Sequence, residues 1–221
     1  MCGIYGVLGP DSEKIENNIR ALETLNHRGP DAGDYFFDKN RRLFFGHKRL
    51  SIIDLSVLGK QPMLSSCERY LISFNGEIYN HKKLLAKLKS SNPNLKMRGG
   101  SDTEVLLECI SLFGLDETLN MSRGMFAAAI YDFQSSSLKL FRDPLGEKPL
   151  YYYKQENNLI FASELKAISK NYNARLNISS SAINWFFAQS CIPAPLTIYD
   201  EVKKVLPGEI ITFELNKQLS S

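Results

Sequence analysis

The stretch Met1-Cys2-Gly3-Ile4-Tyr5-Gly6-Val7-Leu8 decides how this sequence is interpreted. Its residues from Gly3 to Leu8 predict a short buried strand, and Cys2 stands directly before that strand. Removal of Met1 would leave Cys2 with a thiol and a free α-amine, whose ordinary pKa values are about 8.5 and about 8. One residue could then supply both a nucleophile and a base. The alternative is that Cys2 is only a small apolar residue at the start of a strand.

The composition is that of an ordinary globular protein of 221 residues, 43% of them hydrophobic and 23% charged. This hydrophobic fraction excludes a disordered chain. The formal net charge of +3 is too balanced to favour nucleic acid or an anionic membrane as a partner. No apolar run reaches the ~20 residues of a membrane helix, and the N-terminus lacks the basic start of a signal peptide. We therefore expect a cytoplasmic protein.

The four cysteines, Cys2, Cys67, Cys109 and Cys191, are widely spaced and form no C-x-x-C pair. Their spacing suggests neither a zinc site nor a disulfide framework. The three histidines are also scattered along the chain. We therefore expect no metal site.

Hydrophobic periodicity and turn residues divide the chain into strands and helices. Strands are expected at 3–8, 35–37, 43–47, 70–74, 125–131, 138–141, 150–153, 159–161 and 210–213, and helices at 12–25, 84–88, 101–113, 163–170 and 179–189. The four strands between 125 and 161 are expected to form one meander, and 190–207 to cross within the same domain. Ser101 and Glu104 form the pattern of a helix capping box. Because strands come in runs and helices in blocks, the pattern favours an α+β fold.

Seven motifs follow one another along nearly the whole chain. They are Cys2-Gly3-Ile4-Tyr5-Gly6, Arg28-Gly29-Pro30-Asp31, Arg49-Leu50-Ser51-Ile52-Ile53-Asp54, Asn75-Gly76-Glu77-Ile78-Tyr79-Asn80, Ser101-Asp102-Thr103-Glu104, Gly124-Met125-Phe126-Ala127 and Arg142-Asp143-Pro144-Leu145-Gly146-Glu147-Lys148-Pro149-Leu150-Tyr151. In this order they resemble the class II glutamine amidotransferase (glutaminase) domain, in its asparagine synthetase branch. The resemblance covers residues 1–221 as one domain. It implies the fold of N-terminal-nucleophile hydrolases, an αββα sandwich of two antiparallel sheets with outer helices.

The resemblance also implies the chemistry of the site. Cys2 would attack the side-chain amide of glutamine and form a thioester, with its own α-amine as the proton acceptor. The side-chain amide of Asn75 and the backbone N–H of Gly76 would hold the oxyanion. Losing one such donor typically costs about 10²–10³ in rate. Glycine at position 76 is also expected to let the backbone approach the substrate closely.

The same resemblance implies how free L-glutamine is held. Arg49 would bind the α-carboxylate, for which a planar guanidinium is the natural bidentate partner. Asp102, by its side chain, and Glu77, by side chain or backbone, would bind the ammonium group. Backbone groups near Ile52 would add contacts. A glutamine inside a peptide lacks the charges that Arg49 and Asp102 meet.

Simpler interpretations of several residues remain open at this stage. Asp102 at the first turn of a helix stabilises the helix dipole by about 0.3–1 kcal/mol without any further role. Asn75-Gly76 could also be a two-residue hairpin turn, but we set that aside because the strand before it and Glu77 after it fit the resemblance. Arg28 is expected to be structural or a domain contact and not catalytic. The whole domain could also be a catalytically silent module that binds glutamine or scaffolds a partner, above all if Met1 is retained.

The chain departs from the asparagine synthetase branch in one respect. Members of that branch continue into an ATP-binding synthetase domain, and no pyrophosphate loop or P-loop occurs here. We therefore expect no cofactor in this domain, because ATP and Mg²⁺ would belong to the missing synthetase domain. The expected partners are L-glutamine and a synthetase domain, in cis or in trans. A homodimer is a further possibility, and the acceptor of the ammonia is left open.

Overall fold

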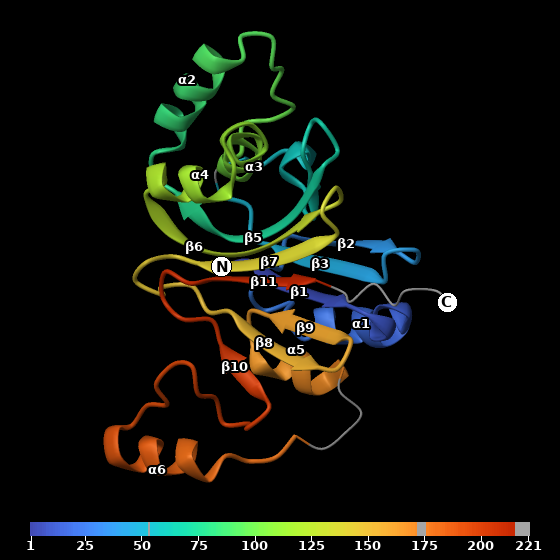
Figure 1. The fold of residues 1–221 in the computed structure, drawn as a ribbon, viewed down its shortest axis with the longest axis vertical. Helices are drawn as coiled ribbons and strands as arrows, with labels where there is room; N and C mark the ends of the chain where they lie inside the picture. The colour runs from blue at the N-terminus through green and yellow to red at the C-terminus, as the bar shows by residue number, and fades with distance from the viewer. Residues whose placement is uncertain (53, 172–175, 215–221) are drawn as a thin grey trace.

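The computed structural model describes residues 1–52, 54–171 and 176–214. Two antiparallel sheets lie face to face, with helices on both outer faces (Figure 1). The first sheet has the strand order β10 (Val202–Lys204), β8 (Tyr151–Gln155), β9 (Asn158–Ala162), β1 (Gly3–Leu8), β3 (Leu43–Arg49) and β2 (Ala32–Asp38). The second sheet has the order β11 (Ile210–Glu214), β7 (Ser137–Arg142), β6 (Gly124–Asp132), β5 (Tyr70–Ile78) and β4 (Met63–Leu64).

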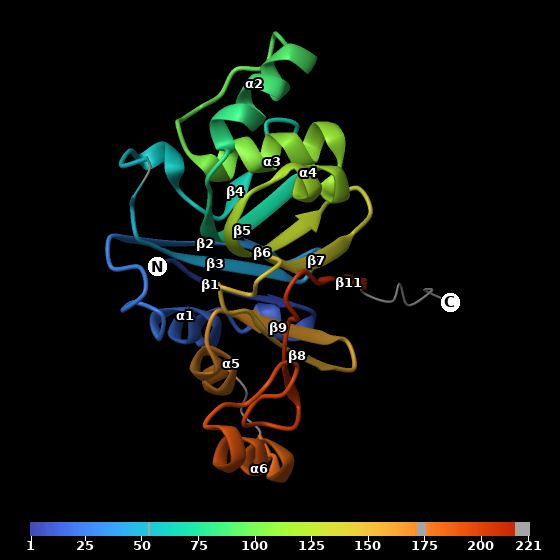
Figure 2. The ribbon, with the colours of Figure 1, turned by 90° about the vertical axis from the view of Figure 1, so that its left-hand side faces the viewer.

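Helices cover the outer face of each sheet. On the second sheet lie α2 (His81–Ser91), α3 (Asp102–Phe113) and α4 (Leu115–Met121), and on the first lie α1 (Ile15–Glu23) and α5 (Leu165–Asn171). A sixth helix, α6 (Ser180–Gln189), stands apart from both sheets (Figure 2). Two short 3₁₀ helices, Pro10–Glu13 and Val57–Gly59, complete the described elements. The expected αββα sandwich is therefore confirmed.

The core between the sheets explains why β1 is central. All six residues of β1 are buried, and the strand pairs with β3 on one side and β9 on the other. Ile4 and Leu8 pack between the sheets with Phe161 and Tyr131. Alternate residues of β1 face α1 and α5 instead. A strand buried on both faces is predominantly apolar, which is why 3–8 shows no polar alternation.

The expected meander between 125 and 161 is wrong. The strands β6 and β7 pair in the second sheet, whereas β8 and β9 pair in the first. Residues 143–150 carry the chain from one sheet to the other. The four strands are thus two hairpins, one in each sheet. The crossing expected at 190–207 stays within the domain, since β10 joins the first sheet.

Among the residues that the structure describes, none of the helices is long and apolar enough to cross a membrane. No group of three or more His, Cys, Asp or Glu side chains in the same part of the chain could hold a metal ion. The four cysteines are all free.

Candidate active site

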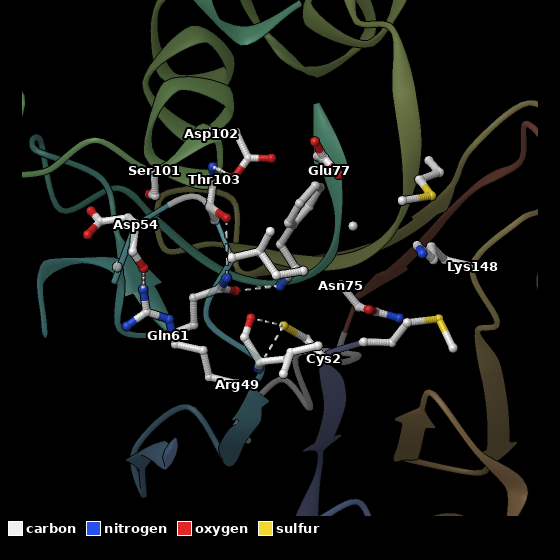
Figure 3. Close-up of a pocket in the computed structure, with 17 residues that line it drawn as sticks. Cys2, Arg49, Asp54, Gln61, Asn75, Glu77, Ser101, Asp102, Thr103 and Lys148 are labelled. Carbon is white, nitrogen blue, oxygen red and sulfur yellow. Dashed lines mark hydrogen bonds between the residues drawn. The ribbon is translucent and has the colours of Figure 1, made fainter. Parts of the chain in front are cut away.

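One pocket opens where β1, β3 and β5 meet the start of α3 (Figure 3). All seven residues singled out from the sequence line it: Cys2, Arg49, Ile52, Asn75, Gly76, Glu77 and Asp102. They come from segments up to 100 positions apart in the sequence. The fold therefore brings the whole candidate set together at one end of the sandwich.

Cys2 lies directly before β1, with its sulfur held at the neighbouring chain. The Leu50 N–H donates to Cys2 Sγ at 3.4 Å, and the thiol faces the Leu50 carbonyl oxygen at 3.7 Å. Burial raises the pKa of the Cys2 thiol, while the Leu50 backbone, the N-terminal charge and the Arg49 guanidinium oppose that rise. The thiol is therefore mostly protonated at neutral pH and needs a base to become nucleophilic.

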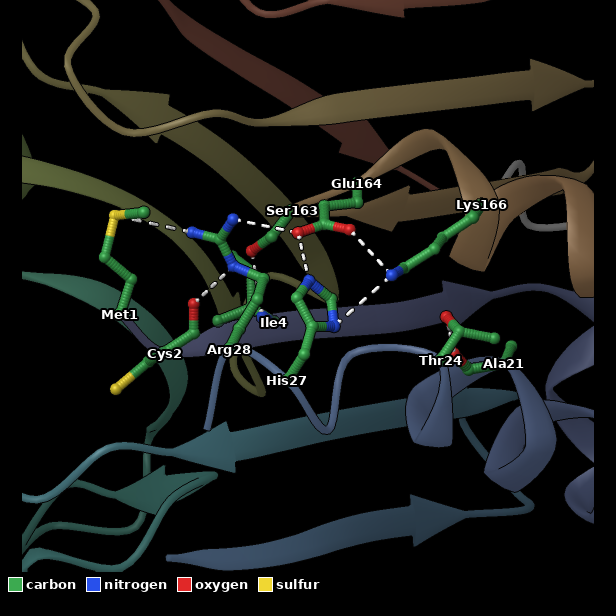
Figure 4. A network of polar contacts seen from close by, with 10 residues as sticks. All are labelled: Met1, Cys2, Ile4, Ala21, Thr24, His27, Arg28, Ser163, Glu164 and Lys166. Carbon is green, nitrogen blue, oxygen red and sulfur yellow. Dashed lines mark hydrogen bonds and ion pairs between the residues drawn. The ribbon is translucent and has the colours of Figure 1, made fainter. Parts of the chain in front are cut away.

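The backbone of Cys2 is fixed by a charged network (Figure 4). Arg28 Nε donates to the Cys2 carbonyl oxygen at 2.9 Å, and Arg28 Nη1 donates to Glu164 Oε1 at 3.0 Å. Glu164 also contacts His27 at 2.8 Å and Lys166 at 3.2 Å. Arg28 is 9% exposed, so its pairing with Glu164 is largely shielded from water. Arg28 therefore has a structural role, as expected: it orients the backbone of Cys2, the residue that carries the thiol.

Asn75 lies inside β5 with its side chain facing the first sheet. It is 1% exposed, and its Nδ2 atom has no hydrogen-bond partner among the described residues. A buried amide N–H without a partner costs about 1–3 kcal/mol. Such a donor next to a thiol is suited to a ligand oxygen. The hairpin-turn alternative for Asn75-Gly76 is wrong, because both residues pair with β6 in mid-strand.

The backbone N–H of Gly76 points to the pocket side of β5. Successive N–H groups of a strand point to opposite edges. The N–H groups of Phe74 and Ile78 point away from β6. The Phe74 N–H donates to Gln61 Oε1 at 2.7 Å, and the Ile78 N–H donates to Asp102 Oδ2 at 2.8 Å. Gly76 lies between them in this alternation. Its N–H therefore lies on the same edge of β5 as those of Phe74 and Ile78.

Gly76 is a glycine for a reason that the sequence did not reveal. A Cβ atom at this position would lie 2.3 Å from the Met125 carbonyl oxygen and 2.6 Å from Phe126 Cβ. The close approach that requires glycine is thus between β5 and β6. Glycine at position 76 is therefore already required by the packing of these two strands, independently of any approach of a substrate.

Arg49 ends β3, and its guanidinium is held by the loop that follows. Arg49 Nη1 donates to the Ser56 carbonyl oxygen at 2.7 Å, and Nη2 donates to that of Asp54. Gly59 makes room for the guanidinium, because a Cβ atom there would lie 2.2 Å from Nη2. Ile52 lies on the same loop and is 67% exposed. The loop orients the guanidinium and leaves further N–H groups of its planar fork for a ligand.

Asp102 is the first residue of α3 and is 6% exposed. Its two carboxylate oxygens accept from Ile78 N at 2.8 Å and from Thr103 N at 2.9 Å. Burial raises the pKa of Asp102, and these two N–H groups oppose the rise. Glu77 projects from the end of β5 and has no ion pair with any described residue. Two carboxyl groups therefore face one wall of the pocket, where a cationic group would be stabilised.

The capping box at the start of α3 forms only in part. Ser101 Oγ accepts from Glu104 N at 3.1 Å, as expected. The Glu104 carboxylate accepts instead from Arg98 N and Gly99 N, both at 2.8 Å. It thus fixes the loop that leads into α3 and, with it, the position of Asp102.

Ten further residues line the pocket, and two of them, Lys148 and Gln61, had no role assigned from the sequence. Lys148 is 7% exposed, and Asp143 Oδ2 accepts from its backbone N–H at 3.1 Å. Gln61 bridges Phe74 N and Thr103 Oγ1. The only signal for Lys148 was its place in the last motif, because a lysine in a polar stretch is ordinarily solvent-exposed. Its location in the pocket follows from the turn between the two sheets.

We expect Arg49→Lys to raise KM for L-glutamine by about 10–100-fold, with a smaller change in kcat. Lysine keeps the charge but loses the planar fork, and charge-assisted hydrogen bonds contribute about 1.5–3 kcal/mol. Steady-state glutamate release measures both constants. Lys48→Ala, one position earlier in β3 with its side chain on the opposite face, is the matched control and should leave KM unchanged. Normal KM for Arg49→Lys would contradict the role of the fork.

The free energy of unfolding of the domain should depend on pH through His47. This side chain is 1% exposed, and its Nε2 atom lies 3.0 Å from the Phe74 carbonyl oxygen. Burial lowers the pKa of His47 to about 4. The unfolded chain, with an ordinary pKa of about 6.5, therefore binds more protons between pH 6.5 and 4. The contribution of neutral His47 is complete above pH 6.5 and is lost as the pH falls toward 4. This loss amounts to at most about 3 kcal/mol.

Urea unfolding of the wild type and of His47→Gln at pH 7 and pH 4.5 measures this effect. The variant removes the titration, so its stability should fall less on acidification than that of the wild type. Equal falls for the two proteins would show that His47 titrates normally in the folded state.

Two facing antiparallel sheets, outer helices and a cysteine at the head of an inner strand define the N-terminal-nucleophile hydrolase class. Within that class, the chain belongs to the glutamine amidotransferase domain family, whose model matches residues 1–220. It is 36% identical to asparagine synthetase (glutamine-hydrolyzing) 1 of Bacillus subtilis, over 96% of this chain and 33% of that protein. It is 37% identical to asparagine synthetase B (glutamine-hydrolyzing) of Escherichia coli, over 76% of this chain and 30% of that protein. The chain therefore spans less than half the length of these curated relatives.

Solved structures agree with the fold. The structure titled as the allosteric regulatory enzyme of purine biosynthesis matches with a TM-score of 0.68 and 20% identity, over 96% of this chain and 47% of that one. Glutamine phosphoribosylpyrophosphate amidotransferase from Bacillus subtilis, complexed with ADP and GMP, matches with a TM-score of 0.61 and 21% identity. That match covers 77% of this chain and 43% of the other. At such identities the likeness concerns the fold alone.

Proposed function

We propose that this domain hydrolyses L-glutamine to glutamate and ammonia through a thioester on Cys2, and that the ammonia serves an asparagine-synthetase-type amidation. The observation that carries the proposal is the pocket itself. A thiol, an unpaired amide donor, a guanidinium and a buried carboxylate converge in it from Cys2, Asn75, Arg49 and Asp102. Each group matches one part of free L-glutamine.

The first half of the reaction breaks the amide bond. After removal of Met1, the α-amine of Cys2 takes the thiol proton, directly or through a water, and the sulfur attacks the side-chain carbonyl carbon of glutamine. Asn75 Nδ2 and the Gly76 N–H stabilise the oxyanion of the tetrahedral intermediate. The protonated α-amine then gives its proton to the leaving nitrogen, and ammonia departs. The γ-carbonyl of the substrate is left as a thioester on Cys2.

The second half uses one water molecule. The free α-amine takes a proton from that water as its oxygen attacks the thioester carbonyl, and the same two donors hold the second oxyanion. Collapse of this intermediate breaks the carbon–sulfur bond. The proton returns to the sulfur, and glutamate leaves. The α-amine suits this work because its ordinary pKa of about 8 lies near the working pH.

Recognition of the amino-acid end rests on opposite charges at the other end of the pocket. The Arg49 guanidinium pairs with the α-carboxylate, and the Asp102 and Glu77 carboxylates pair with the ammonium group. The loop carbonyls of Asp54 and Ser56 already orient Arg49, which lowers the entropic cost of binding. A glutamine inside a peptide offers neither charge, so the site favours the free amino acid.

The use of the ammonia is inferred from relatives that carry the name asparagine synthetase (glutamine-hydrolyzing). A synthetase domain, in cis or in trans, would consume the ammonia, and ATP and Mg²⁺ would act there. The catalytically silent alternative corresponds to the form with Met1 attached, because the Cys2 nitrogen is then a peptide nitrogen. The direct test is release of glutamate and ammonia from L-glutamine by protein whose processing to Cys2 is verified by intact mass.

We expect Asn75→Ala to lower kcat by about 10²–10³-fold with little change in KM, since it removes an oxyanion donor that acts in the transition state. Glutamate release under saturating glutamine measures the loss. Ser73→Ala is the matched control, because Ser73 lies two residues earlier on the same face of β5 and its Oγ is likewise buried without a partner. Its kcat should stay near the wild-type value. A wild-type kcat for Asn75→Ala would exclude the side chain from the oxyanion site.

A further inference from the structure

The helix α6 has an apolar and uncharged composition that is unusual for a solvent-exposed helix. Its sequence, Ser-Ser-Ala-Ile-Asn-Trp-Phe-Phe-Ala-Gln, contains no charged residue. Trp185, Phe186 and Phe187 are 41%, 52% and 81% exposed, and Ile178, just before the helix, is 54% exposed. Large apolar patches of this kind mark interaction surfaces. Aromatic residues in particular are enriched at the centres of interfaces.

The helix also lacks support from the rest of the domain. Ala182 is the only residue of α6 that is buried. Among the described residues, α6 has no extensive contact with another helix or strand, and it stands beyond the layer formed by α1 and α5 (Figures 1 and 2). A ten-residue helix gains little stability from propensity alone and ordinarily depends on packing of its apolar face. Most of the surface of α6 is therefore left uncovered by the described residues.

The base of α6 is nevertheless firmly attached to the sandwich. Ser179 N donates to the Ile198 carbonyl oxygen at 2.9 Å, and Ile178 forms a bridge with Tyr199. On the other side, Lys204 N in β10 donates to the Pro195 carbonyl oxygen at 2.8 Å. The first two contacts join the segment before α6 to the segment that follows it, and the third joins that following segment to β10 of the first sheet. The domain thus presents an apolar helix at a defined position, as a docking element requires.

We propose that the exposed aromatic side chains of α6, Trp185, Phe186 and Phe187, which project from successive positions around the helix, form the docking surface for the ammonia-consuming domain. This inference rests on the proposed function. Its first argument is length, because this chain spans only 33% and 30% of two curated relatives, which therefore carry a large further part. Direct docking would also serve the chemistry, since ammonia released far from its acceptor is protonated and diluted in water.

The size of the surface favours a covalently joined domain over a second copy of this chain. A helix of ten residues is about 15 Å long and about 10 Å wide. It therefore falls short of the roughly 800 Å² per partner that a stable interface between separate proteins buries. A domain in the same polypeptide needs less, because the linkage supplies an effective concentration on the order of millimolar.

Two cysteines of this chain allow a test that does not depend on glutamine hydrolysis. Cys191 follows α6 by two residues and Cys67 lies before β5, and both are exposed. The 221-residue chain is compared with a fusion of this chain to the remaining part of asparagine synthetase 1 of Bacillus subtilis. Maleimide labelling is followed site by site by peptide mass spectrometry. We expect labelling of Cys191 to slow at least tenfold in the fusion, while that of Cys67 stays unchanged.

The double variant Phe186→Ser/Phe187→Ser is made in the same fusion. It should raise the labelling rate of Cys191 in the fusion to the rate measured for the 221-residue chain. Leu112→Ser on α3, where Leu112 is 44% exposed, is the matched control and should leave Cys191 protected. Unprotected Cys191 in the unsubstituted fusion, or protection that survives the double variant, would overturn the proposal. So would a dimer of the 221-residue chain that the double variant dissociates in sedimentation, because a second copy would then occupy α6. Glutamate release by the 221-residue chain separately tests the proposed function.

Discussion

Cys2→Ala is expected to reduce glutamate release to background, a loss of at least about 10⁴-fold, because it removes the nucleophile on which both halves of the reaction depend. The other three cysteines cannot substitute for Cys2. None of them lines the pocket. Burial raises the pKa of Cys109 to about 11, and Cys67 and Cys191 lie on the surface elsewhere. The thioester requires a sulfur beside Asn75, and Cys2 alone among the described cysteines is placed there.

The measurement compares purified, fully processed wild type and variant at saturating glutamine and pH 7.5. Cys191→Ala is the matched control and should retain most of the activity. The melting temperatures of both variants should stay close to that of the wild type, since neither side chain belongs to the buried core. Glutamate production by Cys2→Ala above background would exclude the covalent mechanism.

The second large effect concerns Met1. Protein that retains Met1 should be less active by about 10²–10⁴-fold than protein processed to Cys2. Acylation turns the α-amine into an amide nitrogen, whose lone pair is delocalised into the carbonyl group. Such a nitrogen cannot accept the thiol proton. Because burial already raises the pKa of the Cys2 thiol, the thiolate fraction without a base is small.

The structure adds a steric reason for the same outcome. Met1 itself lines the pocket and lies within 3.8 Å of Arg28 Nη2 through its sulfur. Its side chain would therefore compete with the substrate for space near the thiol. The test prepares both forms, identifies each by intact mass and compares their rates of glutamate release at pH 7.5. Equal rates would remove the α-amine from the mechanism and assign the base to an internal side chain.

The fold could be predicted well from the sequence at the level of its layers. Every expected strand and helix is present, because each carries its own apolar pattern and its own turn residues. The sheet to which a strand belongs was not predictable in the same way. The expected meander at 125–161 splits after β7, since an apolar strand indicates burial but does not specify the facing surface.

The site shows the same division between local chemistry and tertiary placement. The motifs were sufficient to single out Cys2, Arg49, Asn75 and Asp102, because their order along the chain resembles that of the class II glutamine amidotransferase domain. Lys148 was missed, since its burial depends on the turn that joins the two sheets. The reason for glycine at position 76 was also missed, because it is set by the spacing between β5 and β6.

The sequence by itself thus determined the family, the layers and the chemical groups of the site, because these depend on residue identity and on order along the chain. Only the tertiary structure decided that the thiol of Cys2, the unpaired amide of Asn75 and the guanidinium of Arg49 share one pocket. It also decided that α6 presents its aromatic residues to solvent. The physical reason is that strand register and sheet packing fix distances between residues far apart in sequence, and no local pattern encodes those distances.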